Sequence, residues 1–78
     1  MKIERFDEAS QRRALLLMLN ACPRALADTS IKKEMAGADP AFNLFYLASA
    51  GLCTTVSDFS GDTEYAITAQ GIDMLRLS

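Results

Sequence analysis

Residues 39–52 read DPAFNLFYLASAGL, and the two ends of this stretch carry the signals that begin and end an α-helix. Asp39 can cap the first turn with its carboxylate, and Pro40 suits the first helical position because the N–H that proline lacks has no helical partner there. Gly51 is typical of the left-handed residue that ends a helix. We therefore predict a helix over residues 40–50.

Two further helices are predicted before this one. Asp7 is the expected N-cap of a helix over residues 8–21, which Pro23 ends because proline cannot continue the hydrogen-bond ladder. A second, short helix is expected over residues 29–36, and only about three residues separate it from helix 40–50, which is the spacing of a helix-turn-helix. The stripe of the first helix that we expect to be buried is Leu15, Met18, Leu19 and Cys22.

A β-hairpin is predicted after the helices. The composition changes to Thr, Val, Tyr and Ile, and residues 52–58 and 63–68 flank a turn that contains glycine. Thr68 can then cap a final helix over residues 69–77. The expected fold class is therefore α+β, with three helices, a hairpin and a short C-terminal helix in one domain that spans residues 1–78.

The charges are distributed unevenly along the 78 residues, although the net charge is only −2. Residues 1–33 carry seven bases and four acids, or +3, whereas residues 34–78 carry one base and six acids, or −5. No Lys or Arg occurs from Glu34 through Leu75. Because Lys and Arg supply most of the non-specific affinity for phosphates, this acidic part is poorly suited to nucleic acid.

The composition also argues against several classes of protein. There is no histidine, no glycine-rich phosphate loop and no cysteine cluster, so we expect neither an enzyme nor a metal site, and no cofactor. No apolar run approaches the roughly 20 residues that a membrane helix needs. A cytoplasmic protein without membrane contact, with both Cys22 and Cys53 as buried free thiols, is the default expectation.

Two segments resemble those of winged helix-turn-helix domains. Residues 47–52, LASAGL, resemble the L-x-x-x-G-L end of the recognition helix, and residues 65–75, YAITAQGIDML, resemble the Y-x-I-T-x-x-G-x-x-x-L passage from the second wing strand into a closing helix. Residues 11–19, QRRALLLML, and the small size are similar to winged-helix proteins of Mu-like phages and prophages. The resemblance implies a DNA-binding transcription regulator, often dimeric, with helix 40–50 in the major groove and the hairpin, or wing, on the backbone or in the minor groove.

The candidate contacts to double-stranded DNA are few. Lys32 and Lys33 on the second helix and the more distant Arg24 are the best phosphate contacts, although a solvated basic face explains them equally well. On helix 40–50, Asn43 offers the bidentate chemistry that reads adenine and Ser49 offers a hydroxyl. A solvated surface position is the simpler interpretation of Asn43.

Aromatic side chains suggest a second function for the same helix. Counting about 100° per residue from Leu44, we expect Phe42, Tyr46 and Ser49 on the side opposite the core. Phe42 and Tyr46 could form an interface with another protein, or with a second copy of this chain, since aromatics are enriched at interface centres. Phe45 is expected in the core. The alternative to a DNA-binding regulator is therefore a protein-interaction or dimerisation module that does not bind DNA through this helix.

Overall fold

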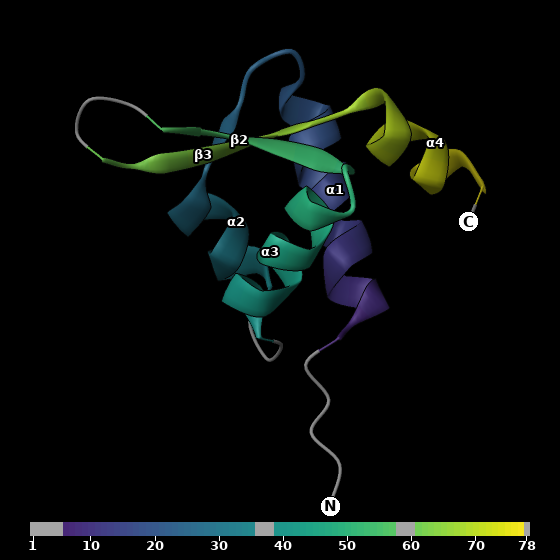
Figure 1. Ribbon diagram of the computed structural model, residues 1–78, viewed down its shortest axis with the longest axis horizontal. Helices are drawn as coiled ribbons and strands as arrows, with labels where there is room; N and C mark the ends of the chain where they lie inside the picture. Colours follow the sequence, from purple (N-terminus) through teal and green to yellow (C-terminus); the bar gives the residue numbers. More distant parts are fainter. Residues whose placement is uncertain (1–5, 36–38, 58–60, 78) are drawn as a thin grey trace, which may run out of the picture.

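The computed structural model describes residues 6–35, 39–57 and 61–77. Its elements follow the predicted order, with one additional short strand before the second helix (Figure 1). The elements are α1 (Glu8–Ala21), β1 (Leu26–Ala27), α2 (Asp28–Glu34), α3 (Pro40–Ser49), β2 (Cys53–Ser57), β3 (Thr63–Ile67) and α4 (Ala69–Leu77). Within these ranges, none of the helices has the length and apolar character that a membrane crossing requires.

The strands form an antiparallel sheet in the order β1-β3-β2, so β3 is the central strand. Tyr65 on β3 lies opposite Thr55 of β2 on one side and opposite Leu26 of β1 on the other. The sequence did not predict β1, because two residues are too few to show the alternation by which a strand is recognised. By pairing with β3, β1 fixes the start of α2 beside the hairpin.

The helix α1 lies at the centre of the fold and packs against α2, α3, α4 and β3. Figure 1 shows the β2–β3 hairpin extending to one side of this helical body and α4 to the other. The hydrophobic core joins α1, α2, α3 and the first residue of β2. Its buried apolar residues are Ala14, Leu15, Met18, Ile31, Met35, Leu44, Leu47 and Cys53.

The buried face of α1 differs from the predicted stripe. Leu15 and Met18 are fully buried as expected, but Leu19 is 36% exposed and Cys22 lies on the surface. The buried face instead runs through Gln11 and Ala14. The prediction that Leu19 and Cys22 are buried was wrong, because the polar Gln11 belongs to the buried face and does not show in a pattern of apolar residues. Only one of the two cysteines, Cys53, is a buried thiol.

A close contact joins the start of α4 to the end of α3. The Thr68 hydroxyl accepts a hydrogen bond from the Gly71 N–H (3.1 Å), which confirms the predicted cap, and donates one to the Gly51 carbonyl (2.7 Å). Gly71 is buried against the backbone carbonyl of Leu52. The order of helices, hairpin and closing helix, with this junction, is that of a small winged helix-turn-helix domain of class α+β.

Candidate nucleic-acid interface

The helix α3 begins at Pro40 as its sequence predicts and ends at Ser49, one residue before the predicted end. The Asp39 carboxylate accepts a hydrogen bond of 3.1 Å from the Phe42 N–H, and Pro40 occupies the first helical position. Gly51, just beyond the end of the helix, has a φ of +79°, a left-handed conformation that glycine adopts without strain. α2 begins one residue earlier than predicted and ends at Glu34, with Met35 as its C-cap, whereas residue 36 of the predicted helix lies outside the described residues.

The outward face of α3 is apolar and uncharged. Phe45 is 70% exposed, and Ala41 and Ser49 are exposed one turn before and one turn after it. Tyr46 is also exposed, and its ring meets that of Phe6 edge to face with centroids 4.9 Å apart. In a winged-helix domain this is the face that enters the major groove. Here it presents two aromatic rings and the hydroxyl groups of Tyr46 and Ser49.

The position of Phe45 corrects the prediction that it belongs to the core. The fully buried residues of α3 are Asn43, Leu44 and Leu47, so the core-facing direction is rotated by about 50° from Leu44, on which the prediction was centred. This rotation brings Phe45 close to the middle of the exposed face. Phe42, which was expected on the side opposite the core, is half-buried. The burial of a polar residue, Asn43, caused the error, and no pattern of apolar residues signals that burial.

Asn43 lies in the interior, so the expectation that it is displayed on the helix surface was wrong. Its Oδ1 accepts hydrogen bonds from the Gln11 side chain (2.8 Å) and the Asp7 N–H (3.0 Å), and its amide group donates to the Asp39 carbonyl (2.8 Å). Both Asn43 and Gln11 are completely buried. These bonds tie the beginning of α1 to the beginning of α3, and Asn43 is therefore not a base-reading residue.

The basic candidates lie at two separate places. Lys32 and Lys33 are in the last turn of α2, whereas Arg24 is exposed in the segment before β1, at the other end of that helix. Lys32 lies 3.1 Å from the Asp28 carboxylate one turn earlier, which neutralises part of its charge. Lys33 is exposed on the same turn. Lys33 and Arg24 are therefore more accessible to a phosphate group than Lys32.

The wing carries the opposite charge. β2 has no charged residue, while Glu64 lies on β3 and Asp62 just before it. A polar cavity of about 440 Å³ lies where the wing meets the start of α2, and Asp28 and Asp62 are among its lining residues. Burial raises the pKa of Tyr65, and the neighbouring Asp28 carboxylate raises it further through its charge and a hydrogen bond. This surface would repel a phosphate group.

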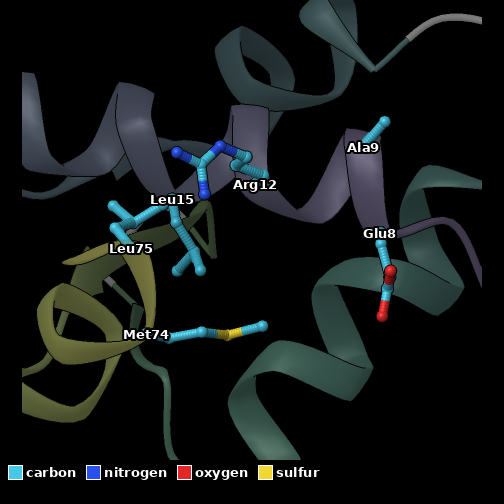
Figure 2. A pocket seen from close by; sticks show the side chains of 6 residues that line it. All are labelled: Glu8, Ala9, Arg12, Leu15, Met74 and Leu75. Atoms are coloured by element: carbon cyan, nitrogen blue, oxygen red, sulfur yellow. The ribbon is translucent and has the colours of Figure 1, made fainter. Parts of the chain in front are cut away.

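An apolar cavity of about 320 Å³ lies on the other side of the molecule, between α1 and α4. Figure 2 shows the Met74 side chain reaching from α4 into this space, with Leu15 and Arg12 on α1 beside it. In the described residues there is no group of three or more acidic or cysteine side chains that could hold a metal ion. The lining residues of the cavity come from α1 and α4 and are mainly apolar.

Comparison with known proteins gives one informative likeness. No family model matches the sequence, and no curated protein matches it either. The fold is similar to that of a MarR transcription factor from Planctomyces limnophilus, known from its crystal structure, with a TM-score of 0.78 and 24% sequence identity. The likeness covers 87% of this chain and 51% of the other, so this chain spans about half the length of that protein. It shows the winged-helix fold.

Proposed function

We propose that this chain is a DNA-binding transcription regulator that acts in the cytoplasm and has no catalytic activity. The observation that carries this proposal is the fold, which is similar over 87% of the chain to that of a MarR transcription factor. The resemblance of residues 11–19 to small winged-helix proteins supports a regulator of the type found in Mu-like phages and prophages. Such regulators are often dimeric, and we extend that expectation to this chain.

The proposed contact with DNA differs from that of a strongly basic winged helix. Lys33 meets a phosphate beside the groove, with smaller contributions from Lys32 and Arg24. On α3, Ser49 donates a hydrogen bond and Phe45 makes apolar contact with thymine methyl groups, the one feature of a base edge that an apolar side chain can recognise. We therefore expect weak binding with low sequence selectivity.

Charge reversal at Lys33 tests this proposal. Lys33→Glu should weaken binding to duplex DNA by at least about tenfold, because a phosphate contact is replaced by a repulsive charge. Arg76→Glu is the matched control: it changes the net charge equally, but Arg76 lies on α4, at the other side of the fold. Fluorescence anisotropy should show that the control binds nearly as well as the unaltered chain. Equal losses in both variants would mean that only net charge matters.

A second candidate function is protein binding through α3. It is favoured by one observation, the 70% exposure of Phe45 beside the exposed Tyr46 on a helix without any charged residue. A solvated helix face normally carries charges, whereas the centre of a protein interface is aromatic and poor in charge. Phe45→Ser should then abolish self-association or partner binding, and Leu77→Ser, which removes an apolar side chain that is 88% exposed on α4, should not.

A further inference from the structure

The chain carries no charged residue between Asp39 and Asp58, a stretch that contains all of α3 and all of β2. The side chains of β2 after Cys53 are nevertheless exposed, and Val56 is 48% exposed. Three of these exposed residues, Thr54, Thr55 and Val56, are β-branched and suit a strand that packs against another strand. β2 is thus a neutral, exposed strand.

β2 is also an edge strand of the sheet, since among the described residues it pairs with β3 alone. The Thr68 N–H donates a hydrogen bond of 3.2 Å to the Leu52 carbonyl, and the register pairs Thr54 with Ala66 and Val56 with Glu64. In an antiparallel pair, alternate residues bond to the neighbouring strand. Even-numbered residues of β2 therefore bond to β3, and the odd-numbered residues direct their backbone N–H and C=O groups outward: Cys53, Thr55 and Ser57.

Edge strands of this kind are usually protected against pairing with another chain by lysine, proline, a bulge or a cover. β2 contains neither lysine nor proline, and its register with β3 runs one to one from Cys53 to Ser57, without a bulge. In the described residues, no further strand of this chain pairs with its outer side. The features that normally keep an edge strand single are therefore missing from β2.

We propose that β2 pairs antiparallel with the same strand of a second copy of this chain, around a two-fold axis at Thr55. The pairing is self-complementary because Cys53 and Ser57 are equally far from the axis, so the outward backbone groups of one copy meet those of the other. The partner's Thr55 lies opposite Thr55, and the partner's Thr54 lies opposite Val56. These β-branched pairs are favourable across a sheet, and no charged side chain is placed opposite another.

The charges of the wing do not oppose a second copy at this edge. Glu64 lies on β3, one strand away from the junction. Three strand spacings of about 4.8 Å would separate the β3 strands of the two copies, so Glu64 and the partner's Glu64 would be about 14 Å apart. This distance exceeds the roughly 10 Å beyond which salt screens the repulsion between exposed charges. The neutral strand thus allows two acidic wings to join without close repulsion. This inference does not depend on DNA binding.

Oligomeric mass in solution tests the pairing. Two short strands bury little surface, so the full chain should be measured by sedimentation up to about 1 mM, where the mass should approach twice the 8.5 kDa of one chain. Thr55→Lys places two like charges opposite each other across the axis and should weaken association by at least about tenfold. Val56→Lys is the control, because it adds the same charge at a neighbouring exposed position that faces the partner's Thr54.

Charge complementation identifies the residue at the axis. Thr55→Glu alone should be monomeric like Thr55→Lys, while an equimolar mixture of the two should regain the dimer mass, with circular dichroism showing that each variant is folded. The proposal is overturned if the unaltered chain stays monomeric up to the highest concentration or if Thr55→Lys dimerises normally. A dimer that Phe45→Ser abolishes and Thr55→Lys leaves intact would instead place the interface on α3.

Discussion

The side-chain amide of Gln11 donates a hydrogen bond of 2.8 Å to Oδ1 of Asn43, and both side chains are completely buried. The bond joins α1 to α3 and is reinforced by the Asp7 N–H, which donates to the same oxygen. Because Asn43 is held in the interior, α3 is rolled so that Phe45 points to solvent. One buried polar contact thus determines which side chains the helix presents to a partner.

Removal of Asn43 should therefore cost much of the stability of the fold. Asn43→Ala leaves the Gln11 amide and the Asp7 N–H without their acceptor, and we expect a loss of about 2–4 kcal/mol in the free energy of unfolding. Ser49→Ala, on the exposed face of the same helix, should change it by less than about 0.5 kcal/mol. Urea denaturation compares the two, and similar small effects would contradict a structural role for Asn43.

Replacement of both partners tests whether the contact is specific. Gln11 Oε1 has no hydrogen-bond partner among the described residues, so Gln11→Met removes a polar group that is only partly satisfied. The double variant Gln11→Met with Asn43→Leu should be less destabilised than the sum of the single variants, because neither side chain is then left with an unpaired polar group. Additive losses in the same denaturation experiment would argue that the two residues act independently.

The cap of α3 should contribute about 1 kcal/mol. Asp39→Ala removes the acceptor of the Phe42 N–H and should lower the free energy of unfolding by about this amount. Asp39→Ser keeps an oxygen that can accept the bond, and serine caps helices about as well as aspartate, so its loss should be only a few tenths of a kcal/mol. If serine and alanine are equally destabilising at this position, the carboxylate does not act as a cap.

Gly71 should not tolerate a larger residue. A Cβ atom at this position would come within 2.7 Å of Ile67 Cγ1 and still closer to the Leu52 carbonyl, which is backbone and cannot turn away. We expect Gly71→Ala to destabilise the fold by about 1–3 kcal/mol, despite the better helix propensity of alanine. Asp73→Ala on the exposed side of α4 is the control. A thermal melt in which Gly71→Ala is as stable as the unaltered chain would contradict the close contact.

The two cysteines should differ in reactivity. Cys22 is exposed, whereas Cys53 is 2% exposed and burial raises its pKa to about 11. A thiol must lose its proton to react, so near pH 8 a disulfide reagent should modify Cys22 quickly and Cys53 only after unfolding. The reactivity of Cys53 should rise with pH toward 11. Cys22→Ser identifies the fast thiol, and a fast reaction in this variant would contradict the burial of Cys53.

Much of the fold could be predicted from the sequence, because its signals are local. The proline and glycine at the ends of helix α3 and the Thr68 cap are set by neighbouring residues, and the structure confirms them. The roll of α3 and the buried face of α1 could not be predicted, since both depend on the contact between Gln11 and Asn43, 32 positions apart. Both residues are polar, so their burial is invisible to a pattern of apolar residues.

The candidate site was predictable in composition but not in arrangement. Lys32 and Lys33 lie together in the last turn of α2 as their adjacency requires, but the ion pair of Lys32 with Asp28 and the exposure of Phe45 depend on the folded chain. The proposed phosphate contact is consequently made mainly by Lys33, with smaller contributions from Lys32 and Arg24. The proposed protein contact moves from Phe42 and Tyr46 to a face centred on Phe45.

The most direct test of DNA binding is its dependence on salt. Affinity for a duplex of about 20 base pairs should be measured by fluorescence anisotropy between about 50 and 200 mM salt. One full phosphate contact, from Lys33, and smaller contributions from Lys32 and Arg24 predict that the logarithm of the binding constant falls with the logarithm of salt concentration with a slope between about −1 and −3. The Lys33→Glu variant should show a shallower slope. The absence of binding at about 50 mM salt would contradict the proposal that this winged helix contacts DNA.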